Sequence, residues 1–431
     1  MLSRHKVVRG AALAAITTGI VYRSVRTLRK ARSILPLGQE PSSTVLPPTV
    51  TVVVPARNEE AVLDNCLRGI REQTYGSERG TSSDAPALRV VVVDDGSTDR
   101  TGEIADEHAA QDSRVHVVHS DGPPPGWSGK VHAMHIGVEA AGQPEAGEWL
   151  LFVDADTVLA PELLSKLLGT AERADADLVS TPGGPPENSS ASWPVLMPAG
   201  LQMIGENADP LGKGSKAFAI GHCILMRRSH YDKIGGWASL SGRRNEDIAI
   251  ATAVRDHGGV TRVVEGLSYV TTSGMDPFKQ GWGSFRKSFV AGTNGSVPVL
   301  LGVGVGQIAL SLASPAMFAR GVRTRKPGLI ALGAIGWVAQ SVSHDRTARV
   351  MHANPGLAPV APFTNAVFGG SRCTEPPRWC AARPVGRDAR RPSERGFPFG
   401  PARVRRSGTP HRFVSRCPIR AVARATPGQC S

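Results

Sequence analysis

The feature that most constrains the fold of this chain is the segment WLLFVDADTVL, residues 149–159, in which an apolar run ends at two aspartates. Residues 150–153 have the length of a buried strand, because the acids stop the apolar run before a helix could form. Asp154 and Asp156 therefore follow the carboxyl end of a strand, the edge at which open α/β sheets bind ligands. Two carboxylates there suit a hard divalent cation that holds a diphosphate. The alternative is a solvated turn in which Asp156 or Thr157 caps the next helix.

Three further apolar runs precede this strand and alternate with helical patterns. Strands are predicted at 50–54, 88–93 and 115–118, and helices are predicted to begin at Asn58 and at Lys130. This alternation predicts an α/β domain whose sheet is mostly parallel, with right-handed crossovers.

Polar side chains follow the carboxyl ends of three of these strands. Because parallel strands end at one edge of a sheet, we expect the three groups to share one crevice. Such a crevice can accept hydrogen bonds from a base and a ribose and bind a metal diphosphate beside them. The groups are Arg57, Asn58 and Glu59; Asp94 and Asp95; and Asp154 and Asp156.

The net charge of +13 is concentrated in the last 61 residues. Residues 371–431 contain fourteen Arg, no Lys and three acids, which supply +11 and leave about +2 for the rest. Arg without Lys, among Pro, Ala, Gly and Cys, is typical of GC-rich codons read out of frame, so we expect a disordered basic tail produced by a frameshift. A basic RNA-binding tail is the alternative, but it lacks interleaved aromatic residues. Cys66 and Cys223 are predicted to be reduced core residues.

Several apolar segments flank the predicted domain. Residues 7–22 precede a run of basic residues, which predicts a weak signal anchor within 1–35 whose basic side is cytoplasmic. Residues 297–318 are uncharged and long enough to span a bilayer, and 327–343 and 353–370 are shorter apolar segments. We therefore expect a multi-pass membrane protein with membrane segments at 297–370. One conflict is that Arg320, Arg323, Arg325 and Lys326 would lie outside if the domain is cytoplasmic, against the positive-inside tendency.

The motifs PARNEE, VVVDDGSTD, GWSGK and VDAD, in this order, resemble the nucleotide-sugar half of family 2 glycosyltransferases of the GT-A fold. The later segments AIGHCILMRRSHYDKIGGW and NED are similar to the acceptor half of those enzymes. Within the family, the chain is most similar to bacterial enzymes that glycosylate carotenoid acids such as diaponeurosporenoate or accompany hopanoid synthesis. The resemblance covers about 48–345 and implies a domain at 48–290, with a nucleotide-sugar half at 48–157 and an acceptor half at 158–290. It also implies a Rossmann-like sheet with helices on both faces.

This resemblance implies a role for each matching residue. Pro55, Arg57 and Glu59 would line the nucleoside, although Arg57 stands where many members have an aromatic residue. Asp95 would accept a hydrogen bond from the base, and Lys130 would offset the charge of the diphosphate. Asp154 would meet the ribose or sugar, and Asp156, with Asp154, would ligate Mg²⁺ or Mn²⁺. Asp247 would be the general base, Glu246 would position it, and Gln280, Trp282, Arg286 and Lys287 would lie near the acceptor and diphosphate.

The implied reaction is an inverting, metal-dependent transfer of one sugar to a hydrophobic acceptor in the membrane. That acceptor would be a carotenoid acid, a hopanoid or a polyprenyl-type lipid. The donor would be a UDP-sugar in preference to a GDP-sugar. Nucleic acid is not an expected partner. The Q-x-x-R-W pattern of processive synthases is absent, which favours a single transfer. Two alternatives remain: a nucleotidyltransferase of the same fold, which more typically has a Gly-rich loop where this chain has PARNEE, and a catalytically inactive membrane scaffold.

Overall fold

The computed structural model describes residues 4–38, 48–75, 87–185, 192–207, 209, 211, 217–243, 245–273, 278–293 and 296–371. All of these belong to one compact unit, Met1–Ala381. The predicted frameshift tail lies outside the described residues, apart from Ser371.

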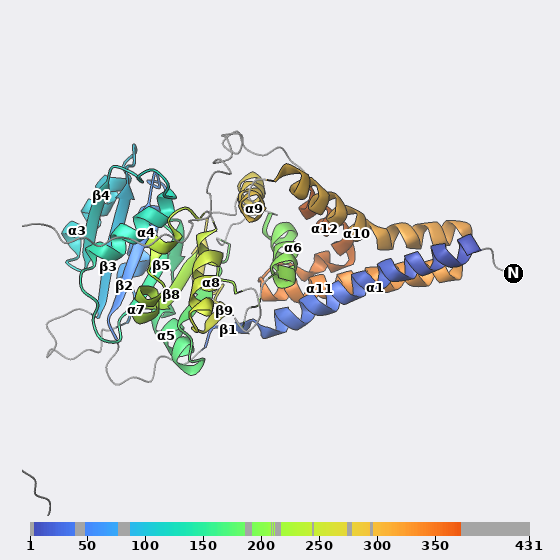
Figure 1. The fold of residues 1–431 in the computed structure, drawn as a ribbon, viewed down its shortest axis with the longest axis horizontal. Coiled ribbons are helices and arrows are strands. Elements are labelled where there is room, and N and C mark those ends of the chain that lie inside the picture. The colour runs from blue at the N-terminus through green and yellow to red at the C-terminus, as the bar shows by residue number, and fades with distance from the viewer. Residues whose placement is uncertain are drawn as a thin grey trace, which may run out of the picture. The chain divides into compact units, whose positions relative to one another are not determined.

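The centre of the fold is an eight-stranded mixed sheet in the order β1-β9-β7-β8-β5-β2-β3-β4 (Figure 1). Strand β8 is antiparallel to both of its neighbours, and the other pairs in this sheet are parallel. This confirms the predicted α/β architecture with a mostly parallel sheet. The strands are β1 Leu35–Pro36, β2 Val50–Ala56, β3 Leu88–Asp95, β4 Val115–Ser120, β5 Trp149–Val153, β7 Leu178–Thr181, β8 Cys223–Arg227 and β9 Thr261–Glu265.

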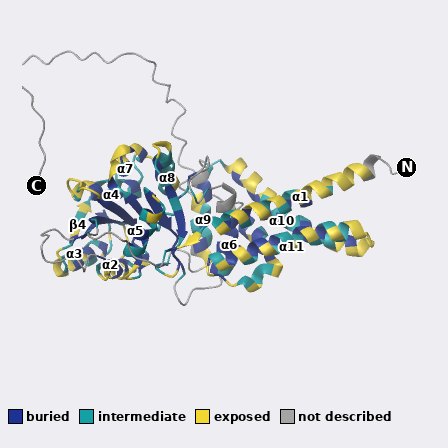
Figure 2. Ribbon diagram, turned by 90° about the horizontal axis from the view of Figure 1, so that it is seen from below, coloured by how far each residue is buried: buried dark blue, intermediate teal, exposed yellow. Residues whose placement is uncertain are grey.

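The strands are rich in β-branched residues, and these side chains are buried because helices cover both faces of the sheet. Along β2, Val52 and Val54 pack with α2 and α5 on one face, and Val53 packs with α4 and α8 on the other. Figure 2 shows the buried strands between these layers. The helices are α1 Arg4–Ser33, α2 Leu63–Arg71, α3 Thr101–Gln111, α4 Gly129–Ala140, α5 Leu163–Arg173, α6 Ser192–Asn207, α7 Arg228–Lys233, α8 Glu246–Asp256, α9 Phe278–Gly292, α10 Val297–Thr324, α11 Pro327–Val350 and α12 Ala361–Gly370, with short 3₁₀ helices at Trp237–Leu240 and Pro355–Val360.

The sheet has a topological switch point between β2 and β5. From β2 the chain proceeds to β3 and β4 on one side, and then returns to place β5 on the other side of β2. Strands β2 and β5 are parallel, with Val53 opposite Phe152, so their carboxyl ends lie together. In α/β sheets the crevice at such a point is where ligands bind.

Two local predictions on this edge need revision. The helix predicted from Asn58 begins only at Leu63, because Asn58 has a φ of 56° and its side chain accepts the N–H of Thr98 at 2.8 Å. A left-handed residue cannot start a right-handed helix. The alternative in which Asp156 or Thr157 caps a helix is excluded, because Thr157 begins strand β6.

Strand β6, Thr157–Leu159, pairs antiparallel with β10, Val270–Thr272. This two-stranded sheet connects the end of the D-x-D segment directly to the predicted acceptor half.

The remaining helices form a second core. Trp193 of α6, Phe285 and Phe289 of α9 and Phe368 of α12 pack together, and Trp193 donates its indole N–H to the carbonyl of Met351 at 2.7 Å. Helices α1, α10 and α11 lie side by side (Figure 1). Among the described helices, α10 alone is long and apolar enough to cross a membrane, so the multi-pass topology stays a prediction. Cys66 and Cys223 are buried free thiols, as predicted.

Candidate functional site

A pocket of about 270 Å³ opens at the carboxyl ends of β2, β3 and β5. The switch point, the start of α4 and the D-x-D turn together form its walls, and every residue predicted for the nucleotide sugar or the metal lines it. The lining is Pro55, Ala56, Arg57, Glu59, Asp95, Gly129, Lys130, Ala133, Asp154, Ala155 and Asp156. Residues from three separate strand ends are thus brought into one crevice, although their roles stay predictions.

Lys130 connects the two halves of the domain at this pocket. Its Nζ lies 2.6 Å from Oδ1 of Asp154 and 2.9 Å from Oε1 of Glu246. Asp154 follows β5 in the predicted nucleotide-sugar half, whereas Glu246 begins α8 in the predicted acceptor half. A Cβ added to Gly221 would lie 3.5 Å from Lys130 Nζ and 3.8 Å from Oδ2 of Asp247. The first turn of α8 is therefore held close to the aspartates of the donor half.

The charge of Lys130 is stabilised by these two carboxylates. Burial alone would lower the pKa of Lys130, but the nearby charges of Asp154 and Glu246 outweigh burial and raise the pKa above its ordinary value. Lys130 therefore stays protonated, and a bound diphosphate would compete with Asp154 and Glu246 for it.

Asp247, the residue predicted as the general base, lies at the start of α8 and has a raised pKa. Burial, followed by the charge of the adjacent Glu246, raises the pKa of Asp247 to about 7. Its Oδ1 accepts the N–H of Ile248 at 2.7 Å, which fixes the carboxyl group at the start of α8. A carboxyl group whose pKa lies near the working pH can accept a proton in the reaction and release it afterwards.

Only one acid of the Asp94-Asp95 pair faces the pocket. The Asp95 side chain is 4% exposed; its Oδ1 accepts the hydroxyl of Ser120 at 3.3 Å, and Arg57 Nη1 lies 3.9 Å from its Oδ2. Asp94 instead accepts the N–H of Ser97 at 3.1 Å. The strand alternation of β3 thus leaves Asp95 available to a base and uses Asp94 to hold a loop.

Asp156 is oriented from the acceptor half. Its Oδ2 accepts the hydroxyl of Thr272 on β10 at 3.3 Å. Nearby, burial and then the charges of Asp156 and Asp154 raise the pKa of Glu59. Three carboxylates therefore crowd one part of the crevice, and this concentration of negative charge favours a cation there. Within the described ranges, no three His, Cys, Asp or Glu side chains form a complete protein-only metal cage.

His222 is a site residue that the sequence predictions did not identify. Its carbonyl accepts the N–H of Asp154 at 3.2 Å, and it directly precedes Cys223, which pairs with Val153 in the antiparallel ladder. The N–H of Gly183 donates to His222 Nδ1 at 2.9 Å, which leaves the ring proton on Nε2 in the neutral tautomer. Burial lowers the pKa of His222, so this neutral form prevails. The available signal was one polar residue at the start of the apolar run HCILM.

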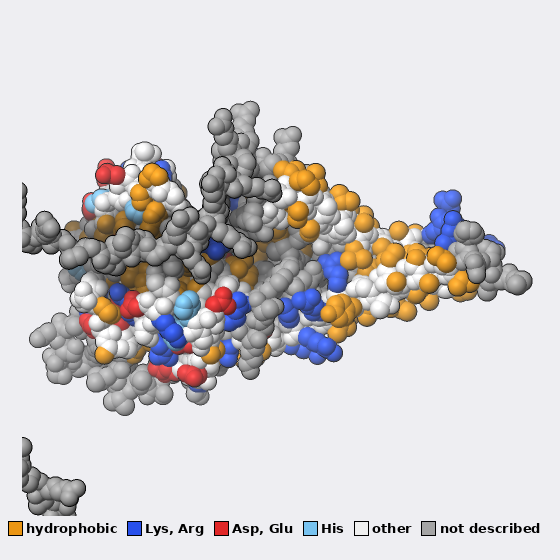
Figure 3. Space-filling model, viewed as in Figure 1, with side chains coloured by type: hydrophobic (Ala, Val, Ile, Leu, Met, Phe, Trp, Pro, Cys, Tyr) orange, Lys and Arg blue, Asp and Glu red, His pale blue; other side chains and the backbone are white. Residues whose placement is uncertain are grey.

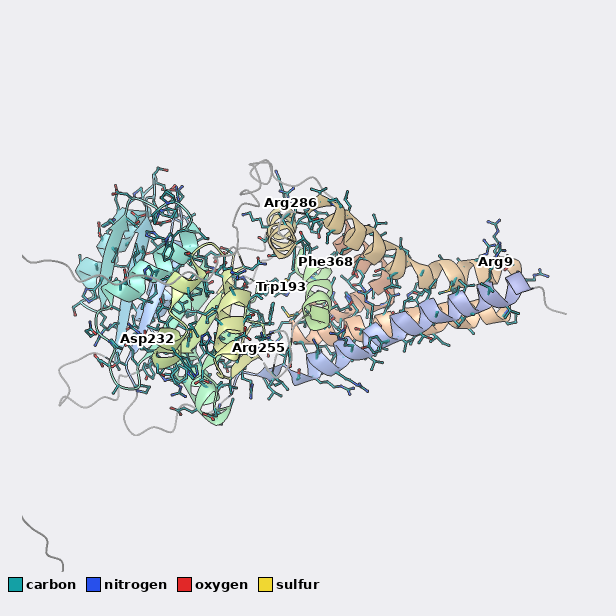
Figure 4. The ribbon with its side chains drawn as sticks, viewed as in Figure 1. Arg9, Trp193, Asp232, Arg255, Arg286 and Phe368 are labelled. Carbon is teal, nitrogen blue, oxygen red and sulfur yellow. The ribbon has the colours of Figure 1, made fainter. Side chains whose placement is uncertain are left out.

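The residues predicted near the acceptor lie on α9, and the described side chains among them do not line the pocket. Trp282 packs beside Phe278 at a ring distance of 5.7 Å and approaches Gly370 of α12. Arg286 is half-buried (Figure 4) and Lys287 is exposed. The side chain of Gln280 is outside the described residues. Helix α9 therefore connects the sheet domain to the helical core and does not build the donor pocket.

Comparison with known proteins gives matches centred on this site. Residues 51–235 match the model of glycosyl transferase family 2. The chain is 26% identical over 280 residues to 4,4'-diaponeurosporenoate glycosyltransferase of Staphylococcus aureus, which covers 62% of this chain and 67% of that protein. It is 32% identical over 130 residues to the glycosyltransferase GlyG of Streptococcus pneumoniae, covering 30% of this chain and 37% of GlyG. The chain therefore spans only about a third of the length of relatives such as GlyG.

Among solved structures, the chain resembles the mannosyltransferase PcManGT from Pyrobaculum calidifontis, solved with GDP-Man and Mn²⁺, with 20% sequence identity and a TM-score of 0.47. The match covers 84% of this chain and 95% of PcManGT.

Proposed function

Residues 51–235 form a glycosyltransferase family 2 domain, and on this premise we propose that the protein transfers a single sugar from a nucleotide-sugar donor to a hydrophobic acceptor in the membrane, with inversion. The observation that carries the proposal is the chain of contacts from Asp154 through Lys130 to Glu246, with Asp247 beside it. It supports a donor site and a proton acceptor in one crevice, as a direct displacement requires.

In the proposed step, Asp247 accepts the proton of the acceptor hydroxyl as its oxygen attacks the anomeric carbon of the donor. A carbon–oxygen bond to the acceptor forms, the bond from the anomeric carbon to the diphosphate breaks, and the nucleoside diphosphate leaves with the electron pair. Lys130 would turn toward the diphosphate and offset the charge of the leaving group. Glu246, which pairs with Lys130 at 2.9 Å, would guide that movement and raise the basicity of Asp247 by its charge. An acceptor that is already an ionised carboxylic acid would need this base less.

The nucleoside would occupy the opposite end of the pocket. Asp95 is buried and can accept an N–H from the base, and Pro55, Arg57 and Glu59 provide the surrounding walls. Arg57 lies close to Asp95, so it can stack on the base in place of the aromatic residue of other members. A UDP-sugar is the favoured donor.

A divalent cation, Mg²⁺ or Mn²⁺, would bind at Asp156 and Asp154. The donor set fits this group, because carboxylate oxygens are the ligands of hard cations and the crowding of Glu59, Asp154 and Asp156 calls for positive charge. When bound, the cation neutralises charge on the diphosphate. The protein would supply one or two ligands, with the diphosphate and water supplying the rest. Mn²⁺ electron paramagnetic resonance tests this: Asp156→Asn should weaken Mn²⁺ binding in the presence of nucleoside diphosphate, and unchanged binding would contradict it.

The acceptor is proposed to be a membrane lipid such as a carotenoid acid, a hopanoid or a polyprenyl-type lipid. Support comes from α10, which has a mean hydropathy of 1.8 over its most apolar window, and from exposed Val299, Val303 and Val305 along it. The similarity to diaponeurosporenoate glycosyltransferase points the same way. We accordingly propose a multi-pass cell-membrane protein whose catalytic domain is cytoplasmic.

Transfer from a panel of radiolabelled UDP- and GDP-sugars tests the proposed reaction. The full chain, purified in detergent, is incubated with each donor, a divalent cation and a bacterial lipid extract, and organic-phase label is counted. Label with one donor, absent in Asp156→Asn, supports a glycosyltransferase. Pyrophosphate release from a nucleoside triphosphate and a sugar phosphate would instead indicate a nucleotidyltransferase. Absence of label with every donor would favour the membrane scaffold.

A further inference from the structure

Five basic side chains lie together at one end of the α1–α10–α11 bundle, and we call them the basic cap. Arg9 lies near the beginning of α1, and the other four surround the turn from α10 to α11. All five are exposed. The basic cap consists of Arg9, Arg320, Arg323, Arg325 and Lys326.

The helix contacts explain why these residues converge. Helix α1 runs parallel to α11, because Thr17 donates its hydroxyl to the carbonyl of Leu332 at 3.4 Å and a Cβ on Gly336 would lie 3.6 Å from Ile20. At 1.5 Å per residue, Arg9 lies about 12 Å before Thr17, and Lys326 lies about 9 Å before Leu332. Arg9 and Lys326 therefore lie at about the same height along the bundle axis, and Figure 4 shows Arg9 at this end of α1.

The cap carries positive charge without a compensating acid. Helices α1 and α10 contain no Asp or Glu, and the first acid of α11 is Asp345, near its other end. Within the described part of the chain, no carboxylate pairs with any of the five basic residues. The cap is thus a concentrated cationic surface and not a network of surface ion pairs.

Apolar side chains adjoin the cap and indicate the class of its partner. Val7, Val8 and Val322 are 58%, 66% and 53% exposed, and Figure 3 shows hydrophobic side chains beside Lys and Arg at this end. The exposed aromatic residues described, Tyr22 and Phe363 among them, lie elsewhere, so a stacking platform for single-stranded nucleic acid is missing from this described surface. Cationic groups beside apolar ones fit the boundary between lipid headgroups and acyl chains.

We propose that the basic cap binds the phosphate headgroups of anionic phospholipids. The proposal rests on the membrane association proposed above. From Val297 to Ala319, α10 is uncharged over 23 residues, which corresponds to about 34 Å of helix and matches a hydrocarbon core of about 30 Å. When α10 crosses the bilayer, the cap therefore reaches the headgroup layer. Binding to headgroups also accounts for a basic turn on the side that the positive-inside tendency disfavours.

Lipid binding by the full chain in detergent tests the basic cap. The triple variant Arg320→Gln, Arg323→Gln and Lys326→Gln is compared with a matched variant, Arg68→Gln, Arg100→Gln and Lys233→Gln, which removes three exposed charges from the sheet domain. Fluorescent phosphatidylglycerol and phosphatidylcholine are titrated into each protein. At about fivefold per basic residue, the cap variant should bind phosphatidylglycerol roughly 100-fold more weakly, with phosphatidylcholine unchanged. The matched variant should bind like the wild type.

Equal phosphatidylglycerol binding by the cap variant and the wild type would overturn the proposal. So would an RNA oligonucleotide that binds the wild type more tightly than phosphatidylglycerol does and fails to bind the cap variant. Transfer of radiolabelled sugar is measured on the same samples. A wild type that transfers sugar but binds phosphatidylglycerol no more tightly than phosphatidylcholine refutes the cap alone, whereas absence of transfer in the wild type refutes the proposed function.

Discussion

The crevice and the α1–α10–α11 bundle place their charged side chains in opposite ways. In the crevice, Lys130 lies within 3 Å of two carboxylates from different halves of the domain. In the bundle, α10 is uncharged from Val297 to Ala319, and its basic residues are confined to the end that forms the cap. Where polar side chains of α10 and α11 meet in the bundle, they are neutral: the side-chain amide of Gln340 donates to the hydroxyl of Ser314 at 2.7 Å.

This difference in the placement of charge indicates what each region contacts. Buried charges are costly and tend to be retained where a reaction needs them, so their convergence supports the proposal that the crevice is the chemical site. A helix that excludes charge over a bilayer's width but exposes Val side chains is adapted to a non-aqueous surrounding. The two regions therefore divide the proposed task between chemistry and access to a lipid acceptor.

The largest expected effect comes from removing the proposed general base, Asp247, from the crevice. Asp247→Asn keeps the size of the side chain but cannot accept a proton, so kcat/KM for sugar transfer should fall by about 10²- to 10⁴-fold. Asp256→Asn is the control, because Asp256 is an exposed acid at the other end of α8 and should leave the rate unchanged. Undiminished transfer by Asp247→Asn would remove the base from the mechanism and indicate an acidic acceptor.

A second prediction places a charge on the uncharged stretch of α10, where we expect it to weaken membrane insertion. Val303 is 49% exposed on α10, and Val303→Asp should cost about 2.5–3.5 kcal/mol of membrane insertion if this position meets the bilayer centre. Alkaline extraction of membranes would then release the variant. Val322→Asp, at the level of the cap, is the matched control and should be retained. Retention of both variants would show that this face of α10 does not contact lipid.

Removing the cation of the crevice should leave two carboxylates without their partner. Lys130→Met should lower the free energy of unfolding by about 1–3 kcal/mol, because Asp154 and Glu246 lose an ion pair in a partly buried site. Chemical denaturation measures this, and the KM for the donor should rise in parallel. Lys233→Met is the control, because it removes an exposed Lys that donates a hydrogen bond to the carbonyl of His257. If Lys130→Met is as stable as the wild type, the two carboxylates are solvated and the bridge has no structural importance.

The pH dependence should separate Asp247 from ordinary surface acids. Since its pKa is raised to about 7, the unprotonated base accumulates as the pH rises, and log kcat/KM should increase by about one unit per pH unit below 7 and then level off. For stability the sign is opposite. The folded state holds this proton more tightly than the unfolded state, so stability falls between about pH 4 and pH 7. Asp247→Asn should therefore be more stable than the wild type at pH 7, and this advantage should vanish near pH 4.

The positions of the four parallel strands β2 to β5 were predicted from the sequence, because their apolar runs are short and end in polar residues, whereas β1, β7 and β9 were not predicted. The seven residues predicted for the donor site do line one pocket, in part because strand ends share an edge, but their roles rest on the family resemblance and stay predictions. The direction of β8 was not predictable, as an apolar run such as CILM pairs equally well in either orientation. Long-range contacts were also out of reach: neither the Lys130–Glu246 pair nor the hydrogen bond from Gly183 to His222 leaves a local pattern. Asn58 misled the helix prediction because its left-handed backbone depends on the partner loop at Thr98.

The antiparallel strand β8 also limits how the sheet can be assembled during synthesis. It lies between β5 and β7, both of which leave the ribosome before it does. Until residue 227 has emerged, each of these two strands has an unpaired edge that faces its missing neighbour, and such edges invite pairing with other chains. The D-x-D turn follows β5, so it lies beside an open sheet edge until β8 has paired.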